Sequence, residues 1–197
     1  MDYNRLLRNS HIFASTVREV LERHFLEETS SLPLSISQFY LLKLISNNER
    51  YQVGEIAELL GVSNAAASKN IDKLESLDLV TRTTSEGDRR ATLLTLNPRG
   101  KRLVRKYEEL KAERLSPVLD QFDPAEIEEL SRLLEKFSAE VFRFEGPAGD
   151  ELENSYCLRC AVYLERDCPV GDILGGCPYN TLYAAHHPEH AVTEGTG

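Results

Sequence analysis

The 197-residue sequence contains no apolar run that approaches the roughly 20 residues needed to span a bilayer. Its first residues, Met1–Arg5, are not followed by the apolar stretch of a secretory signal peptide. We therefore expect no membrane association and a cytoplasmic location. A glycine-rich phosphate loop, a paired-carboxylate site and a Ser-His-Asp arrangement are also missing. For this reason we predict no catalytic residues and do not expect an enzyme.

Cysteine is absent from the first 156 residues, and the four cysteines that follow are Cys157, Cys160, Cys168 and Cys177. Thiols that serve only to fill a core would be scattered over the apolar faces of the chain, and disulfides are rare in cytosolic proteins. Four thiolates complete the coordination shell of a tetrahedral zinc ion or of an iron–sulfur cluster. The cysteines therefore predict one metal site.

The spacing of these cysteines favours an iron–sulfur cluster, of the 4Fe-4S type, over zinc. One Cys-x-x-Cys pair is followed by two isolated cysteines, whereas structural zinc sites usually use two closely spaced pairs. Both isolated cysteines precede a proline, in Cys168-Pro169 and Cys177-Pro178, and a Cys-Pro step also occurs at ferredoxin cluster ligands. Zinc and a metal-free thiol switch remain the alternatives.

The net charge of −9 is unevenly distributed along the chain. Residues 61–106 carry ten positive and five negative side chains, a net charge of +5, so the rest of the chain carries −14. Because attraction to phosphates is screened over about 10 Å at 0.1 M salt, the local charge of a binding face matters more than the total. The acidic remainder would repel DNA and so favour a single docking orientation.

This basic stretch contains the pattern of a helix-turn-helix. A short amphipathic helix with Ile56 and Leu60 on its apolar side ends at Gly61, and Ser63 is a strong N-cap for a second helix. Ordinary surface helices can share such a turn, so the pattern alone is not specific. In the second helix, the small residues Ala65, Ala66 and Ala67 would allow close approach to a major groove. The residues that we expect at this groove are Ser63, Asn64, Ser68, Lys69 and Lys73.

Two β-branched segments follow, at 79–84 and 91–96, and they predict a hairpin with a basic tip at 85–90. A helix-turn-helix followed by such a hairpin is a winged helix, whose wing can place an arginine in the adjacent minor groove. We expect Arg89 to make this contact and Asp88 to orient a wing arginine, with Arg82 as the candidate partner. The wing residues predicted to serve DNA binding are Arg82, Asp88, Arg89 and Arg90.

With these motifs the sequence resembles the MarR family of bacterial transcription regulators. The segments that carry the resemblance are Glu55–Ala57, Leu60–Ser63, Leu74-Glu75, Leu79–Arg82, Asp88–Arg90 and Leu94–Gly100. The resemblance covers roughly residues 5–144. It implies a mainly α fold with a small β-hairpin wing and a homodimer assembled through the terminal helices. A two-fold symmetric dimer would bind double-stranded DNA at an inverted-repeat operator.

Helices are expected on both sides of this unit. A helical repeat runs from about Asn4 to Glu27, with His24 expected at a helix interface, and Ser35 to Gln38 form a capping box for a central buried helix. Asn97-Pro98 should begin a long helix that Pro117 ends or kinks near residue 119. Asp123–Glu126 should begin the last helix. Its apolar stripe, which we expect to pack against a partner chain, is Ile127, Leu130, Leu134, Phe137, Val141 and Phe144.

The chain thus divides into a winged-helix and dimerisation domain (1–144), a cysteine-rich metal-binding extension (145–180) and a tail expected to be mobile (181–197). The first hypothesis is a homodimeric DNA-binding regulator whose cluster senses redox state, oxygen or iron. The second is a small-molecule-responsive regulator with a structural zinc site. The third is a thiol or electron-transfer protein on a winged-helix scaffold.

Overall fold

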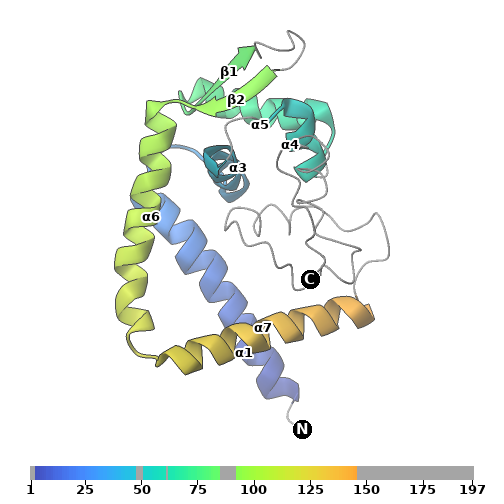
Figure 1. The fold of residues 1–197 in the computed structure, drawn as a ribbon, viewed down its shortest axis with the longest axis vertical. Coiled ribbons are helices and arrows are strands. Elements are labelled where there is room, and N and C mark those ends of the chain that lie inside the picture. Colours follow the sequence, from blue (N-terminus) through green and yellow to red (C-terminus); the bar gives the residue numbers. More distant parts are fainter. Residues whose placement is uncertain (1–2, 48–50, 61, 85–91, 146–197) are drawn as a thin grey trace, which may run out of the picture.

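The computed structural model describes residues 3–47, 51–60, 62–84 and 92–145 of the chain (Figure 1). In chain order, the elements in these ranges are α1 (Tyr3–Thr16), η1 (Val17–His24), α2 (Phe25–Thr29), α3 (Ile36–Asn47), α4 (Val53–Leu60), α5 (Asn64–Ser76), β1 (Val80–Thr84), β2 (Thr92–Leu96), α6 (Pro98–Leu119) and α7 (Pro124–Glu145). The fold is mainly helical with one two-stranded antiparallel hairpin, which confirms the predicted class. No helix in the described ranges is long and apolar enough to cross a membrane.

The first helical path comprises α1, η1 and α2, and the helix predicted from Asn4 to Glu27 is confirmed at nearly its expected ends. Its middle segment, η1, is wound with π-type hydrogen bonds. Only its last part enters the core, where Phe25 and Leu26 are buried and α2 packs against α6. The apolar residues of α1, including Ile12 and Phe13, stay exposed in the single chain.

The buried centre of the molecule is α3, as its apolar sequence predicts. Its capping box forms as expected: the Ser35 amide donates to Gln38 Oε1, and the Gln38 amide donates to Ser35 Oγ, both at 3.1 Å. Every residue from Phe39 to Ile45 is buried. Figure 1 shows α3 end-on, with the hairpin and α5 above it and α6 beside it. Contacts of α3 with α5, β2 and α6 make it the scaffold of the winged helix.

The last two helices form a long arm. Asn97 Oδ1 accepts the amides of Arg99 and Gly100, each at 3.1 Å, and so caps α6 as predicted. The helix continues two residues beyond Pro117 and ends at Leu119. A second capping box then starts α7, with Asp123 and Glu126 exchanging hydrogen bonds of 3.0 and 2.8 Å.

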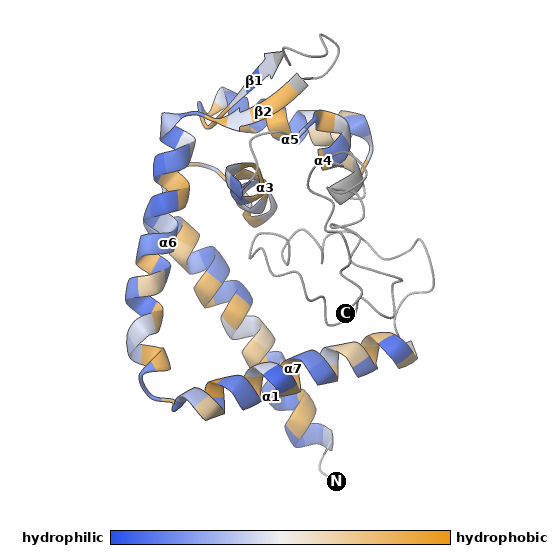
Figure 2. Cartoon of the chain, viewed as in Figure 1, coloured by the Kyte–Doolittle hydropathy of each residue, from blue (hydrophilic) through white to orange (hydrophobic). Residues whose placement is uncertain are grey.

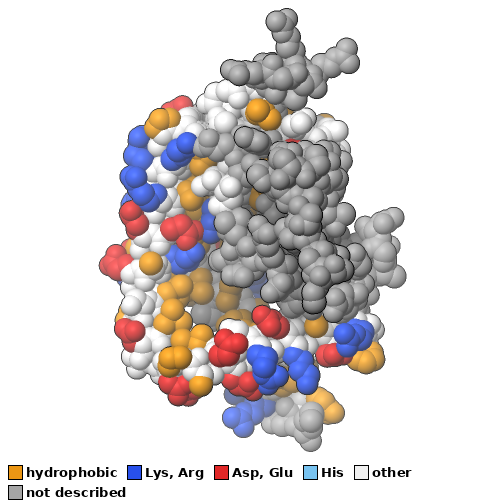
Figure 3. All heavy atoms as spheres, in the orientation of Figure 1, with side chains coloured by type: hydrophobic (Ala, Val, Ile, Leu, Met, Phe, Trp, Pro, Cys, Tyr) orange, Lys and Arg blue, Asp and Glu red, His pale blue; other side chains and the backbone are white. Residues whose placement is uncertain are grey.

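Only the first half of α6 packs against the core. Leu103, Val104 and Tyr107 of α6 are buried, whereas the end of α6 and the described side chains of α7 are exposed or half-buried. Figure 2 shows apolar residues recurring along α1 and α7, and Figure 3 shows hydrophobic side chains at the surface where the two arm helices meet. The arm therefore carries an apolar face that the single chain leaves uncovered.

Candidate nucleic-acid interface

A helix-turn-helix is formed by α4 and α5, as the sequence predicts. The Val62 amide donates to Ala57 O at 3.0 Å in the turn, and Ser63 Oγ accepts the Ala66 amide at 3.2 Å to cap α5. Ala67, Ile71 and Leu74 are fully buried on one side of α5. Because these three residues recur at intervals of three and four, they fix which face of the helix is turned outward.

The outward face of α5 carries most of the predicted DNA-binding side chains. Ser63, Asn64 and Lys69 are exposed, while Ser68 and Lys73 are half-buried at its edges. Of the three small residues expected to allow close approach, Ala65 is exposed and Ala66 is half-buried, but Ala67 is buried in the core, so that expectation was wrong for Ala67. The face begins at the helix N-terminus, where backbone amides favour anions. Its first half therefore presents donors and positive charge to solvent.

The hairpin lies beside α5. In the register of its strands, Val80 is opposite Leu96 and Arg82 is opposite Leu94. Three side chains of the hairpin itself, Val80, Leu94 and Leu96, are buried in the core. The predicted tip residues Asp88, Arg89 and Arg90 lie outside the described residues, and so their roles stay predictions.

Arg82 forms ion pairs with two carboxylates of α5. Its Nη2 lies 2.6 Å from Asp72 Oδ1, and its Nη1 lies 2.5 Å from Glu75 Oε2. Burial lowers the pKa of Arg82, but the hydrogen bonds and charges of Asp72 and Glu75 outweigh this and raise it. From the sequence we predicted Asp88 as the partner of Arg82, and we did not predict a contact with Asp72 or Glu75. The signal that could have found them is their spacing of three residues on the helix that precedes the strand.

A polar cluster fixes the junction of α5, the hairpin and α6. Asp78, after the end of α5, has a positive φ of 58°, a conformation that short polar residues tolerate. Asp78 Oδ1 accepts a hydrogen bond of 2.8 Å from Asn97 Nδ2, and Arg99 Nη1 donates to Leu77 O at 2.9 Å. The N-terminus of α6 is thus held against the C-terminal end of α5.

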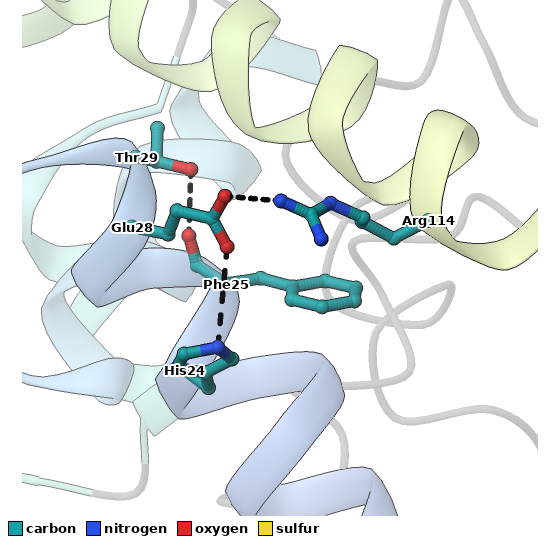
Figure 4. A network of polar contacts seen from close by, with 5 residues as sticks. All are labelled: His24, Phe25, Glu28, Thr29 and Arg114. Carbon is teal, nitrogen blue, oxygen red and sulfur yellow. Dashed lines mark hydrogen bonds and ion pairs between the residues drawn. The ribbon is translucent and has the colours of Figure 1, made fainter.

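The first helical path is fastened to α6 by polar contacts (Figure 4). Glu28 accepts a hydrogen bond of 2.5 Å from Arg114 Nη2, and Lys106 Nζ donates to Thr29 O at 2.8 Å. His24 Nε2 lies 3.9 Å from Glu28, and its side chain is 64% exposed. The expectation of His24 at a helix interface is therefore wrong within the single chain, where it lies at the surface beside this network.

The predicted metal ligands Cys157, Cys160, Cys168 and Cys177 lie outside the described residues. The metal site therefore stays a prediction from the sequence. The predicted domain boundaries at 145 and 181 likewise fall at or beyond the end of the described chain, Glu145.

Residues 34–92 match the model of the MarR family. This range begins just before α3 and ends at the first residue of β2, so it contains the helix-turn-helix. Two helix-turn-helix transcriptional regulators of Bacillus subtilis are similar in sequence. YfiV is 29% identical across 64% of this chain and 87% of its own, and YpoP is 28% identical across 59% and 80%.

Two solved structures share the fold. RV1404 from Mycobacterium tuberculosis is 26% identical, with a TM-score of 0.57 over 70% of this chain and 93% of its own. FabT from Streptococcus pneumoniae, solved in complex with DNA, is 19% identical, with a TM-score of 0.61 over 73% and 100%. The arrangement of helices and hairpin described above is therefore one that other winged-helix proteins adopt.

Proposed function

We propose that this chain is a DNA-binding transcription regulator of the MarR type. It binds its operator as a homodimer through α5 and the hairpin. The observation that carries the proposal is the outward face of α5, where Asn64 and Lys69 are exposed beside the capped N-terminus. Asparagine and lysine side chains can bond to base edges or phosphates in a major groove. FabT, which shares the fold, has been solved with DNA bound, and this supports the choice of ligand. No enzymatic activity is part of this function.

The apolar faces of the terminal helices support the homodimer. Leu6, Ile12 and Phe13 are exposed on α1, and Leu134 and Phe137 are exposed on α7. An apolar face of this extent is unfavourable in water and is typical of surfaces buried by a second protein chain. A two-fold axis through this contact would pair two α5 helices and require an inverted-repeat operator, with half-sites about one helical turn apart.

The DNA-binding part is tested by the salt dependence of affinity. Lys69→Ala should lower the slope of log affinity against log salt by roughly one unit, because one phosphate contact fewer releases one counterion fewer. Lys136→Ala is the matched control, since Lys136 is an exposed lysine on α7. The duplex is one that the wild-type protein selects from a random-sequence pool. Equal slopes for both variants would argue against a DNA contact by this face.

The wing is tested in the same assay. Arg89→Ala should weaken binding to the selected duplex, since the loss of a minor-groove arginine removes a favourable charge contact. Asp88 and Arg90 belong to the same predicted tip. An Arg89→Ala protein with wild-type affinity and slope would remove the wing tip from the interface.

The second part of the proposal concerns how the protein senses conditions in the cell. Cys157, Cys160, Cys168 and Cys177 together bind one iron–sulfur cluster, of the 4Fe-4S type, whose state sets DNA affinity. The support is their spacing, their Cys-Pro steps and their position in the sequence after α7, the helix assigned to the dimer contact, from which residues 146–156 separate them. Because a metal site rarely persists without its metal, cluster loss would unfold its surroundings and alter whatever they brace.

A visible absorption spectrum of anaerobically purified protein is the first test of the metal, because an iron–sulfur cluster is coloured and zinc is not. Operator affinity is then measured for the anaerobic protein, the air-exposed protein and Cys168→Ser. Equal affinity of all three would leave the cysteine site without a sensing role. A colourless protein with bound zinc would favour the small-molecule-responsive regulator, and a coloured protein without DNA binding would favour an electron-transfer protein.

A further inference from the structure

The outward face of α5 changes character along its length. Asn64 and Lys69 lie in its first two turns, and Asp72 and Glu75 follow on the same face at intervals of three. Both carboxylates belong to exposed residues, with side chains 63% and 39% accessible. A helix that enters a DNA groove would bring these two negative charges towards the phosphates. The recognition face is thus half basic and half acidic.

The side chain of Arg82 pairs with both carboxylates of this acidic half. It comes from β1, and each terminal nitrogen of its guanidinium contacts a different carboxylate, at 2.6 Å on Asp72 and 2.5 Å on Glu75. Arg82 is itself only 26% accessible, less than either of its partners. The planar guanidinium of arginine places donors on two terminal nitrogens in a rigid fork, and so it can hold two carboxylates in fixed positions, whereas a lysine ammonium is a point charge on a flexible stem. The contact joins the hairpin to the recognition helix.

We propose that Arg82 is a positioning residue which acts on DNA through α5 and does not itself hold a phosphate. It neutralises Asp72 and Glu75, and it fixes the angle of the wing against the recognition helix. This inference rests on the proposed function and deepens it, because it removes Arg82 from the predicted DNA contacts and adds Asp72 and Glu75 to the residues that set affinity.

The charges of the face support this role. Lys69 and Lys73 supply two positive charges and Asp72 and Glu75 two negative ones, so Arg82 decides whether this segment attracts phosphates. Without Arg82 the charges of the two exposed carboxylates would not be neutralised and would repel the DNA backbone. If Arg82 acts only through them, its removal should matter only while they are charged.

The test is a double-mutant cycle on affinity for the duplex that the wild-type protein selects. One arm compares the wild type with Arg82→Gln. The other compares Asp72→Asn/Glu75→Gln with the triple variant that adds Arg82→Gln. Arg82→Gln should weaken binding on the order of tenfold in the wild-type background. In the neutralised background the same change should alter affinity by no more than about threefold, because the partners are gone.

The outcomes separate three cases. A direct phosphate contact by Arg82 predicts the same loss in both backgrounds, with the salt slope reduced by roughly one unit each time, and this result overturns the proposal. No loss in either background overturns it as well. Failure of the wild-type protein to bind duplex DNA in a salt-dependent manner contradicts the proposed function itself. Thermal unfolding of all four proteins, with midpoints unchanged, shows that affinity and not folding has been altered.

Discussion

The ammonium group of Lys43 lies 2.6 Å from Glu108 Oε1, and this pair joins α3, at the centre of the winged helix, to the arm helix α6. The Lys43 side chain is only 6% accessible and lies 5.7 Å from the ring centre of Tyr107. Glu108 also pairs with Lys111, one turn further along α6. Burial lowers the pKa of Lys43, although Glu108 opposes the shift. The joint between the DNA-binding unit and the arm is therefore a partly buried ion cluster.

Glu108→Gln should destabilise the fold by about 2–3 kcal/mol, because it removes the carboxylate that faces a buried ammonium, with a discount for the partial exposure of Glu108. Chemical unfolding at neutral pH measures the change. Glu109→Gln on the same helix is the matched control, since Glu109 is 68% exposed and 3.6 Å from Arg105. The control should change stability by less than about 0.5 kcal/mol. Similar losses of unfolding free energy in the two variants would show that the Lys43–Glu108 pair stabilises the fold no more than an exposed ion pair does.

The stability of the protein in acid should depend on the same carboxyl group. Burial raises the pKa of Glu108, but hydrogen bonds from Lys111 and Lys43 outweigh it and hold the pKa below its ordinary value of 4.5. The folded state therefore binds fewer protons than the unfolded state in this range, so this contribution is present above pH 4.5 and is lost as pH falls through the folded pKa. Unfolding curves of wild type and Glu108→Gln should converge as the pH is lowered. Parallel curves would contradict this assignment.

A methyl group at Gly100 cannot be accommodated. A Cβ there would lie 2.2 Å from the backbone oxygen of Leu79, so Gly100→Ala must move α6 away from the strand connection. We expect a loss of about 2–3 kcal/mol in the free energy of unfolding. Gly54→Ala is the control, because its Cβ would meet only Asn64 Oδ1, at 4.0 Å. That variant should be neutral or more stable by up to about 0.5–1 kcal/mol, since alanine favours helix. The reverse order of stabilities would refute the close approach.

The exposed face of α7 should control assembly. Phe137→Asp places a charge at the middle of this face and should convert a dimer to a monomer in sedimentation at micromolar concentration, because burial of an unpaired carboxylate is unfavourable. Glu135→Lys, on the same helix, is the control for a change of charge and should remain dimeric. Residues 1–144 without the cysteine segment should also dimerise. A monomeric wild-type protein would leave the apolar stripe of α7 without the role proposed for it.

Local features of the fold could be predicted from neighbouring residues alone. The boxes at Ser35–Gln38 and Asp123–Glu126 and the cap at Asn97 form as expected, because each satisfies backbone amides within three residues of itself. The polar residues expected at the groove likewise lie on the outward side of α5, where Ser63, Asn64 and Lys69 are exposed and Ser68 and Lys73 are half-buried. These signals act over a single turn of chain, where the backbone geometry is already fixed.

The sequence by itself therefore determined the order of the helices, the winged helix-turn-helix and the polar face of α5. Tertiary structure decided which charges meet. Arg82 lies against Asp72 and Glu75, and Lys43 lies against Glu108 on a distant helix. It also decided that the apolar residues of α1 and α7 stay uncovered in one chain. The physical reason is that a helix period or a cap is satisfied within a few residues, whereas the partner of a long charged side chain depends on how separate elements pack, and many alternative partners have nearly equal local energies.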